Sequence, residues 1–222
     1  MNSSKNRSRV CAVIPFYNEE PFIRDVVQNT LKFVDLVFAV NDGSTDNSEK
    51  LINDFNNVII LSSDQNRGKG YALKLGFYES LKRGFDIIVT LDADNQHNPD
   101  FIPVLINELN GNDIIIGNRL NNMKDMPFIR IFSNKITSTL LSIKTKQKII
   151  DSQCGFRAYK RNVLEKVKTT SEGFEAESEI LILSARAGFR IGFVNIPTVY
   201  ANERSKMNPV EAIIGFINIL FR

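Results

Sequence analysis

The stretch Phe85-Asp86-Ile87-Ile88-Val89-Thr90-Leu91, followed at once by Asp92-Ala93-Asp94, decides the fold. An apolar run rich in β-branched residues and bounded by polar ones is typical of a strand buried on both faces of a sheet. The two carboxylates then lie at the carboxyl end of that strand, where α/β proteins bind ligands. Close carboxylates repel each other unless a cation lies between them, and Mg²⁺ is commonly held by carboxylates together with phosphate oxygens. The tripeptide therefore predicts a metal–diphosphate site, although a solvated Asp-rich turn would use the same residue types.

Strand-like and helix-like patterns alternate around this stretch. Short apolar runs predict strands at residues 10–14, 36–40, 58–61, 85–91 and 113–117. Helical periodicity predicts the helices between them, at residues 20–33, 46–55 with Asp46 as the cap, 69–83 and about 99–109. Strands that alternate with helices of this length indicate βαβ units and a mostly parallel sheet. We therefore expect an α/β fold with a Rossmann-like central sheet flanked by helices.

The second half of the chain is less regular. The pattern predicts a helix at 128–143, a short strand at 156–159, a helix at 175–187 and a strand at 190–200 that is broken near Pro197. No linker separates this half as a second domain. We expect it to cover the edge of the sheet and to shape the acceptor side of the site.

Composition indicates one globular domain. The chain has 222 residues, 43% of them hydrophobic and 24% charged, and a net charge of only +3, so no bulk electrostatic field favours nucleic acid. Cys11 and Cys154 lack metal-ligand spacing and fit a reducing cytosol. Residues 1–9 are typical of a disordered lead-in rather than a signal peptide. No run reaches the roughly 18 apolar residues of a membrane span.

A polar cluster follows each of four predicted strands. The clusters are Pro15–Glu20, Asn41–Asp46, Asn66–Gly70 and Asp92–His97. The carboxyl ends of parallel strands share one edge, so the clusters should converge on one rim. Glycines there let backbone approach a ligand, and helix N-termini supply N–H groups for phosphate. Ordinary turn formation explains the residue types, but not why two carboxylates and the basic Arg67-Gly68-Lys69 share an edge.

In their order along the chain, the four clusters resemble the motif set of the family-2 inverting glycosyltransferases. Three later pieces resemble the branch that contains dolichyl-phosphate mannosyltransferase and bacterial polyprenyl-phosphate glycosyltransferases: Gly117-Asn118-Arg119, Asp151-Ser152-Gln153-Cys154-Gly155-Phe156-Arg157 and Arg204-Ser205-Lys206. The resemblance covers about residues 10–207, which we take as one domain. It implies a GT-A fold, a GDP- or UDP-linked sugar donor, and Mg²⁺ or Mn²⁺.

The resemblance also implies roles for individual residues. Asp42 would hydrogen-bond the nucleobase, and Asn41 replaces the first acid of the family's Asp-Asp-Gly-Ser turn. The implied nucleotide-binding set is Pro15, Tyr17, Glu19, Asp42, Lys69 and Asp92. The implied metal set is Asp92, Asp94 and Gln96, and the metal would stabilise the charge of the leaving diphosphate. His97 beside Asn98 and Pro99 is more typical of a cap or packing residue, so we do not assign it as a general base.

Two hypotheses about the function differ in the acceptor, which is either a hydroxyl group or a lipid phosphate. A hydroxyl nucleophile needs a base near its proton, whereas a lipid phosphate already carries negative charge and needs cations. A possible cationic cluster consists of Arg119, Arg130, Arg157, Arg204 and Lys206. The members closest to the branch's pattern complete a predicted catalytic set of Asp92, Asp94, Arg119, Arg204 and Lys206. For a hydroxyl acceptor, the candidate bases are Glu175, Glu177 and Glu179, which otherwise indicate the exposed first turn of a helix.

Residues 208–222 have almost no polar face. They predict a helix that lies on a membrane surface, buries in a partner, packs in the core, or begins a truncated transmembrane segment.

We expect an inverting, metal-dependent hexosyltransferase that moves a sugar from a nucleotide-diphosphate donor to a polyprenyl (dolichyl-type) phosphate. We expect it in the cytoplasm, peripheral at the cytoplasmic face of the membrane. The alternatives are a hydroxyl-acceptor glycosyltransferase of cell-surface polysaccharide synthesis and a nucleotidyltransferase, which should carry a Gly-rich, basic loop where Pro15–Glu19 stands. A non-catalytic binding module is a further alternative, against which the Asp92/Asp94 pair argues.

Overall fold

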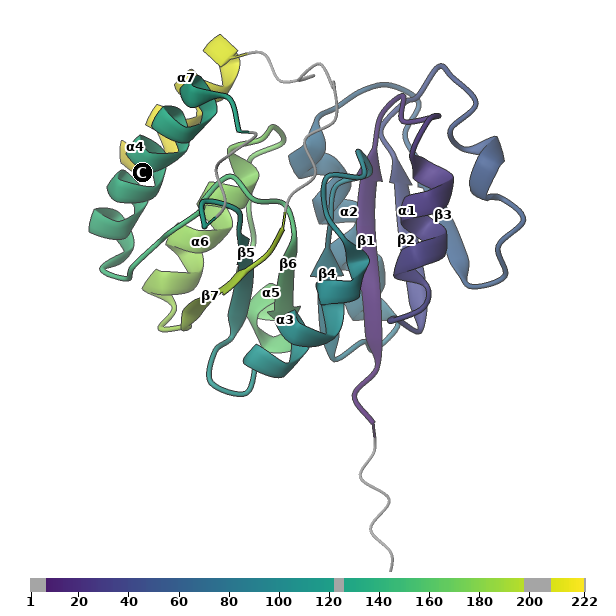
Figure 1. The fold of residues 1–222 in the computed structure, drawn as a ribbon, viewed down its shortest axis with the longest axis horizontal. Helices are drawn as coiled ribbons and strands as arrows, with labels where there is room; N and C mark the ends of the chain where they lie inside the picture. The colour runs from purple at the N-terminus through teal and green to yellow at the C-terminus, as the bar shows by residue number, and fades with distance from the viewer. Residues whose placement is uncertain (1–6, 122–125, 198–208, 222) are drawn as a thin grey trace, which may run out of the picture.

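A computed structural model describes residues 7–121, 126–197 and 209–221. Within these residues seven strands form one sheet in the order β3-β2-β1-β4-β6-β5-β7 (Figure 1). The strands are β1 Val10–Phe16, β2 Leu36–Asn41, β3 Val58–Ser62, β4 Ile87–Thr90, β5 Ile114–Asn118, β6 Arg157–Lys160 and β7 Ile191–Asn195. The structure confirms a mixed α/β sheet that is mostly parallel.

Helices cover both faces of the sheet (Figure 1). One layer holds α1 (Ile23–Thr30), the 3-10 helix η2 (Pro99–Phe101) and α3 (Ile102–Glu108). The opposite layer holds α2 (Lys69–Lys82), α5 (Arg161–Lys166) and α6 (Ala176–Arg186). Two further helices, α4 (Phe128–Thr145) and α7 (Pro209–Phe221), contact α6 at the margin of the molecule. No helix among the described residues is long and apolar enough to cross a membrane.

The core forms because β1 is buried along its whole length between the two helical layers. Its neighbours in the sheet, β2 and β4, run parallel to it, and Phe16 pairs with Asn41 while Val13 pairs with Thr90. Helix α2 approaches β1 closely at Gly76, where an added Cβ would lie 2.3 Å from Val13 Cγ1. This packing fixes the amino end of α2, and the residues that precede it, against the carboxyl ends of the strands.

The direction of one strand was not predicted, and the expectations for two helices are corrected. Strand β6 runs antiparallel to both β4 and β5. The predicted helix 46–55 is reduced to the 3-10 helix η1 (Lys50–Ile52). Asp46 does not cap it, because its carboxylate accepts hydrogen bonds from the backbone N–H groups of Glu20 and Ser48. The predicted helix 99–109 divides into η2 and α3, and Asn98 is the residue that caps η2, by accepting from Asp100 N at 3.0 Å.

The ends of the chain also differ from expectation. Arg9, assigned to a disordered lead-in, donates its backbone N–H to Asp86 Oδ2 at 2.8 Å, and its guanidinium lies over the Phe85 ring. The short helix α5 was not predicted. The predicted catalytic residues Arg204 and Lys206, and the end of the predicted domain at 207, lie outside the described residues.

Candidate active site

The first two polar clusters are joined by side-chain to backbone hydrogen bonds. Asn18, which adopts a positive φ of 53°, accepts from Thr45 N at 2.7 Å through its Oδ1 atom. Its own N–H donates to Ser44 Oγ at 3.0 Å, and Glu19 N donates to Ser48 Oγ at 2.8 Å. The loop after β1 and the loop after β2 therefore form one surface, which carries the predicted nucleotide-binding residues Tyr17 and Glu19. The third predicted residue, Pro15, is buried within β1.

Asp42 joins the second cluster to the third. Its two carboxylate oxygens accept from the backbone N–H groups of Arg67 at 2.9 Å and Gly68 at 2.8 Å. Asp42 is buried, so these charge-assisted bonds hold the loop that leads into α2. Each carboxylate oxygen has a further lone pair, so contact with a nucleobase stays compatible with this role and stays a prediction.

Lys69 joins the third cluster to the fourth. Its Nζ lies 2.6 Å from Asp92 Oδ1 and 2.9 Å from Glu177 Oε2 on α6. Burial alone would raise the pKa of the Asp92 carboxyl, but the Lys69 ammonium and the contact with His97 outweigh it and hold that pKa well below its usual range. Burial likewise opposes the charge on Lys69, and the two carboxylates outweigh it and raise the Lys69 pKa.

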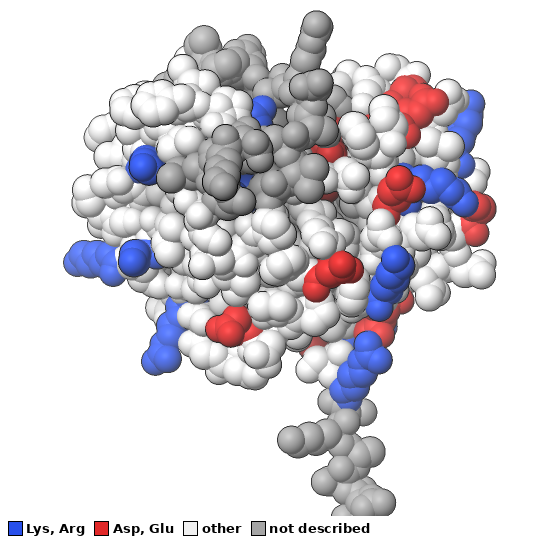
Figure 2. All heavy atoms as spheres, viewed as in Figure 1, with Lys and Arg blue, Asp and Glu red and all other residues white. Residues whose placement is uncertain are grey.

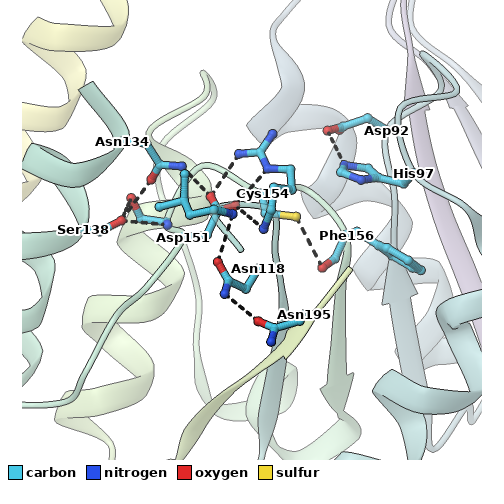
Figure 3. Close-up of polar contacts among 12 residues, drawn as sticks. Asp92, His97, Asn118, Asn134, Ser138, Asp151, Cys154, Phe156 and Asn195 are labelled. Carbon is cyan, nitrogen blue, oxygen red and sulfur yellow. Dashed lines mark hydrogen bonds and ion pairs between the residues drawn. The ribbon is translucent and has the colours of Figure 1, made fainter. Parts of the chain in front are cut away.

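The second oxygen of Asp92 faces His97 and Gly155 (Figure 3). The distance from His97 Nε2 to Asp92 Oδ2 is 3.8 Å. An added Cβ at Gly155 would lie 2.4 Å from that oxygen, so only glycine fits there without displacing the carboxylate. His97 is buried, and its ring centroid lies 5.5 Å from that of Phe156. The structure thus supports a packing role for His97 rather than that of a solvent-facing base.

Asp94 lies on the turn that follows Asp92. Its Oδ1 accepts from Gln96 N at 3.1 Å, and Asn95 between them has a positive φ of 59°. Within the described residues, no three Asp, Glu, His or Cys side chains cluster closely enough to hold a metal ion unaided. Asp92 is already paired with Lys69, which it shares with Glu177, so Asp94 is the carboxylate that best fits a hard divalent cation. Such an ion would need diphosphate oxygens to complete its ligands, which is the mode Mg²⁺ favours.

Asp151 fixes Arg119, the residue that follows the end of β5. The carboxylate accepts from Arg119 N at 3.0 Å, from Nε at 2.9 Å and from Nη2 at 3.0 Å. Asn134 on α4 donates to the same carboxylate at 2.6 Å (Figure 3). Asp151 is fully buried, and although burial would raise its pKa, the bonds from Arg119 and Asn134 hold that pKa below the usual range. Arg119 and Asn134 of α4 therefore bond to the same carboxylate, that of Asp151.

Two other predicted groups turn out to be structural. Arg157, placed in the possible acceptor cluster, is fully buried and donates to the carbonyls of Cys154, Ser152 and Glu177. Of the three predicted acids, Glu177 and Glu179 on α6 are buried rather than exposed, while Glu175 just before the helix is half-buried. Glu179 accepts from the loop at 169–171, and those hydrogen bonds lower its pKa against the effect of burial.

The pairing of Glu177 with Lys69 was missed by the sequence-based reasoning. The acid lies on the first turn of a helix, where helix-dipole preference accounts for it. No local pattern reveals a partner that lies so far away along the chain.

Comparison with known proteins identifies the family. Residues 11–168 match the model of Glycosyl transferase family 2. The chain belongs to that family. It is 32% identical to a UDP-N-acetylglucosamine–dolichyl-phosphate N-acetylglucosaminyltransferase of Methanococcus voltae, over 92% of this chain and 90% of that protein. It is 28% identical to the polyprenol monophosphomannose synthase of Mycolicibacterium smegmatis, over 90% of this chain and 81% of that protein.

The fold of this family-2 glycosyltransferase is confirmed as GT-A by solved structures. Glucosyl-3-phosphoglycerate synthase from Mycobacterium tuberculosis, in complex with Mn²⁺, UDP and phosphoglyceric acid, superposes with a TM-score of 0.73 at 21% identity. The match covers 96% of this chain and 79% of that one. The family match and this fold together confirm the expectation of a glycosyltransferase from the four motif clusters.

Proposed function

We propose that this family-2 glycosyltransferase moves a sugar, with inversion, from a nucleotide-diphosphate donor to a polyprenyl phosphate, with a divalent metal ion. One structural observation carries the choice of acceptor. Of the three acids that could serve a hydroxyl acceptor as a base, Glu177 is buried and bonded to Lys69, and Glu179 is buried and bonded to the loop at 169–171. The third, Glu175, is half-buried and accepts a hydrogen bond from Gly173 N. A phosphate acceptor needs no base.

The donor side follows from the joined loops. The nucleoside would lie on Pro15, Tyr17, Glu19 and Asp42, and the diphosphate beside Lys69 and Asp94. Asp94, with support from Asp92 and Gln96, would hold Mg²⁺ or Mn²⁺, which would supply positive charge to the departing diphosphate. We favour a UDP-linked donor, because the Methanococcus voltae relative is named for a UDP-sugar and aligns along 90% of its own length.

In the transfer step, an oxygen of the lipid phosphate attacks the anomeric carbon of the sugar. The new bond joins that oxygen to the carbon, and the bond from the carbon to the donor diphosphate breaks on the opposite side. Arg119, held by Asp151, would orient the acceptor phosphate, because a guanidinium suits a phosphate geometrically and stays charged. Arg204 and Lys206 belong to the proposal by the resemblance of their motif. One relative is named as a dolichyl-phosphate transferase and another as a polyprenol monophosphomannose synthase, and both names support this acceptor class.

Because a polyprenyl phosphate resides in a bilayer, we also propose a peripheral position at the cytoplasmic face of the membrane.

The proposal is tested by combining donor binding with transfer. A thermal-shift screen of UDP- and GDP-sugars, with and without Mn²⁺, should find a donor that stabilises the protein only with metal, since ligands that bind the native state raise its apparent stability. With that donor, an organic extract should contain glycosylated polyprenyl phosphate. The Asp94→Ala variant should form it at least roughly a hundredfold more slowly, because it loses several kcal/mol of leaving-group stabilisation. Full activity of that variant in excess EDTA would contradict the metal-dependent site.

A further inference from the structure

Helix α4 carries a continuous apolar face that is open to solvent. Six large hydrophobic side chains on it have exposed fractions between 40% and 82%: Phe128, Ile129, Phe132, Ile136, Leu140 and Ile143. At 3.6 residues per turn, these positions fall within about a third of the helix circumference. The opposite face, with Asn134, Ser138 and Leu141, is buried against the protein. We refer to the six exposed residues as the α4 apolar face.

The charged residues of the segment that carries the α4 apolar face are all positive. Residues 128–148 contain Arg130, Lys135, Lys144, Lys146 and Lys148 and no Asp or Glu. No described acidic side chain forms an ion pair with Lys135, Lys146 or Lys148, all of which are exposed. The side of the molecule that bears α4 and α7 likewise shows Lys and Arg but no Asp or Glu at its upper left margin (Figure 2).

Helix α7 lies beside α4 (Figure 1). Lys144 on α4 donates its ammonium to the carbonyl of Leu220 on α7. While Ile219 of α7 is buried, Ile214, Ile217 and Phe221 are exposed. The apolar surface therefore spans two adjacent helices, and the cations lie on the first of them.

We propose that the α4 apolar face, extended by α7, docks this enzyme on the surface of an anionic lipid bilayer, with α4 lying in the plane of the interface. The inference rests on the proposed function for its biological purpose. A helix with large apolar side chains on one face, whose charged residues are all Lys or Arg, is the pattern of an interfacial helix, which combines apolar insertion with attraction to anionic headgroups.

A second copy of this chain is a poorer occupant of the surface. An isologous dimer through α4 would place the same five cations of each copy close together, without an acid from residues 128–148 to compensate them. An anionic headgroup layer supplies the missing counter-charge. The charge pattern therefore selects a lipid surface over self-association.

Docking through α4 would also position the acceptor site. The buried face of α4 donates from Asn134 to Asp151, and the same carboxylate holds Arg119 through three hydrogen bonds. A helix fixed at headgroup depth would thereby fix the height of the Arg119 guanidinium, which is where a membrane-embedded phosphate is presented.

The first test measures vesicle binding directly. Wild-type protein should co-sediment with vesicles of phosphatidylglycerol and phosphatidylcholine, without donor or acceptor present. The Phe128→Ser/Phe132→Ser variant should bind on the order of 100-fold more weakly, because it loses two large apolar side chains from the interface. Tyr78→Ser is the matched control: Tyr78 is 62% exposed but lies on α2, so its removal should leave binding unchanged. Equal binding by wild type and the Phe variant would overturn the proposal.

The second test separates charge from apolar insertion. The Lys146→Gln/Lys148→Gln variant should lose about fivefold in affinity per residue for anionic vesicles, and nothing for pure phosphatidylcholine vesicles. Lys32→Gln, on the far side of the sheet, should match wild type on both. If the Lys146→Gln/Lys148→Gln variant lost the same affinity for anionic and for pure phosphatidylcholine vesicles, the proposed attraction between these lysines and anionic headgroups would be contradicted.

Further readouts keep this proposal distinct from the proposed function. The Phe variant should keep wild-type unfolding and wild-type transfer to a short, water-soluble prenyl phosphate, while losing transfer to acceptor embedded in vesicles. If no prenyl phosphate is ever glycosylated but vesicle binding behaves as described, the proposed function fails and the docking surface stands. If the wild type ignores anionic vesicles and instead forms a dimer that Phe132→Ser dissociates, the docking surface fails.

Discussion

Lys69 is the side chain that holds the fourth polar cluster in place, since its ammonium lies between Asp92 and Glu177. Lys69→Met should lower the free energy of unfolding by about 3–5 kcal/mol, because it leaves two poorly solvated carboxylates without their cation. Urea denaturation at pH 7 measures the change. Lys74→Met is the control, since Lys74 pairs with the half-exposed Glu172, and such a pair contributes at most about 1 kcal/mol. Equal losses for the two variants would show that the Lys69 pairing is not special.

Asp42 has two roles that one substitution should expose together. Asp42→Ala removes the acceptor of the Arg67 and Gly68 N–H groups, and the proposed acceptor of a nucleobase N–H. Leaving such donors unpaired costs about 1–3 kcal/mol. We expect calorimetry to record weaker nucleotide binding, and thermal unfolding to record a lower Tm. Unchanged nucleotide affinity with a lower Tm would restrict Asp42 to holding the loop.

At this scale the sequence predicted the identity of the rim residues better than their partners. Asp92 and Asp94 follow a strand as expected, since an apolar run and its end are local features. The burial of Arg157 and Glu177 could not be read from local patterns, because each depends on packing between β6, α2 and α6. Asp151, the hydrogen-bonding partner of Arg119, lies in a motif that the sequence revealed. The three hydrogen bonds between the two residues could not be predicted from that motif.

At the scale of elements, the close approach of α2 to β1 is the feature most open to test. Gly76→Ala places a Cβ 2.3 Å from Val13 Cγ1 in the core. Overpacking of this kind should destabilise the protein by about 1–3 kcal/mol, measured by urea denaturation. Gly111→Ala is the control, because a Cβ at Gly111 meets nothing within 4 Å, so its change should stay within about 0.5 kcal/mol. If Gly76→Ala unfolded at the same urea concentration as the wild type, α2 could move away from Val13 without loss of stability.

Element prediction succeeded where periodicity was strong and failed where side chains bond outside their own segment. The helix expected at 46–55 is mostly absent because its first residues bond to other parts of the rim. Asp46 accepts from Glu20 N, Ser48 accepts from Glu19 N, and Glu49 accepts from Asn41 at 2.6 Å. The antiparallel direction of β6 also escaped prediction, since an apolar run carries no information about strand direction.

For the whole molecule, stability should depend on pH through the paired acids. The pKa values of Asp92 and Asp151 lie below their ordinary value of 3.8, so their stabilisation is complete above that pH and is lost as pH falls through the folded-state values. Lys69 has a pKa raised above 10.5, so its stabilisation is complete below that pH and is lost only in strong alkali. The free energy of unfolding should therefore be nearly flat between about pH 6 and 9 and fall in acid.

Urea denaturation across this range checks the pH profile. Asp151→Asn should be less stable than wild type at pH 7 and should show a shallower loss in acid, because one of the titrating carboxyls is gone. An identical acid slope in wild type and Asp151→Asn would contradict the role of Asp151.

The central claim is that the acceptor is a lipid phosphate, and one comparison tests it most directly. Polyprenyl phosphate and the corresponding polyprenol differ only in the phosphate, so both should be offered to the enzyme with the stabilising nucleotide-sugar and Mn²⁺, and the lipid products measured by mass spectrometry. We predict a glycosylated polyprenyl phosphate and no glycosylated polyprenol. Efficient transfer to the polyprenol hydroxyl, with the phosphate ignored, would contradict the account.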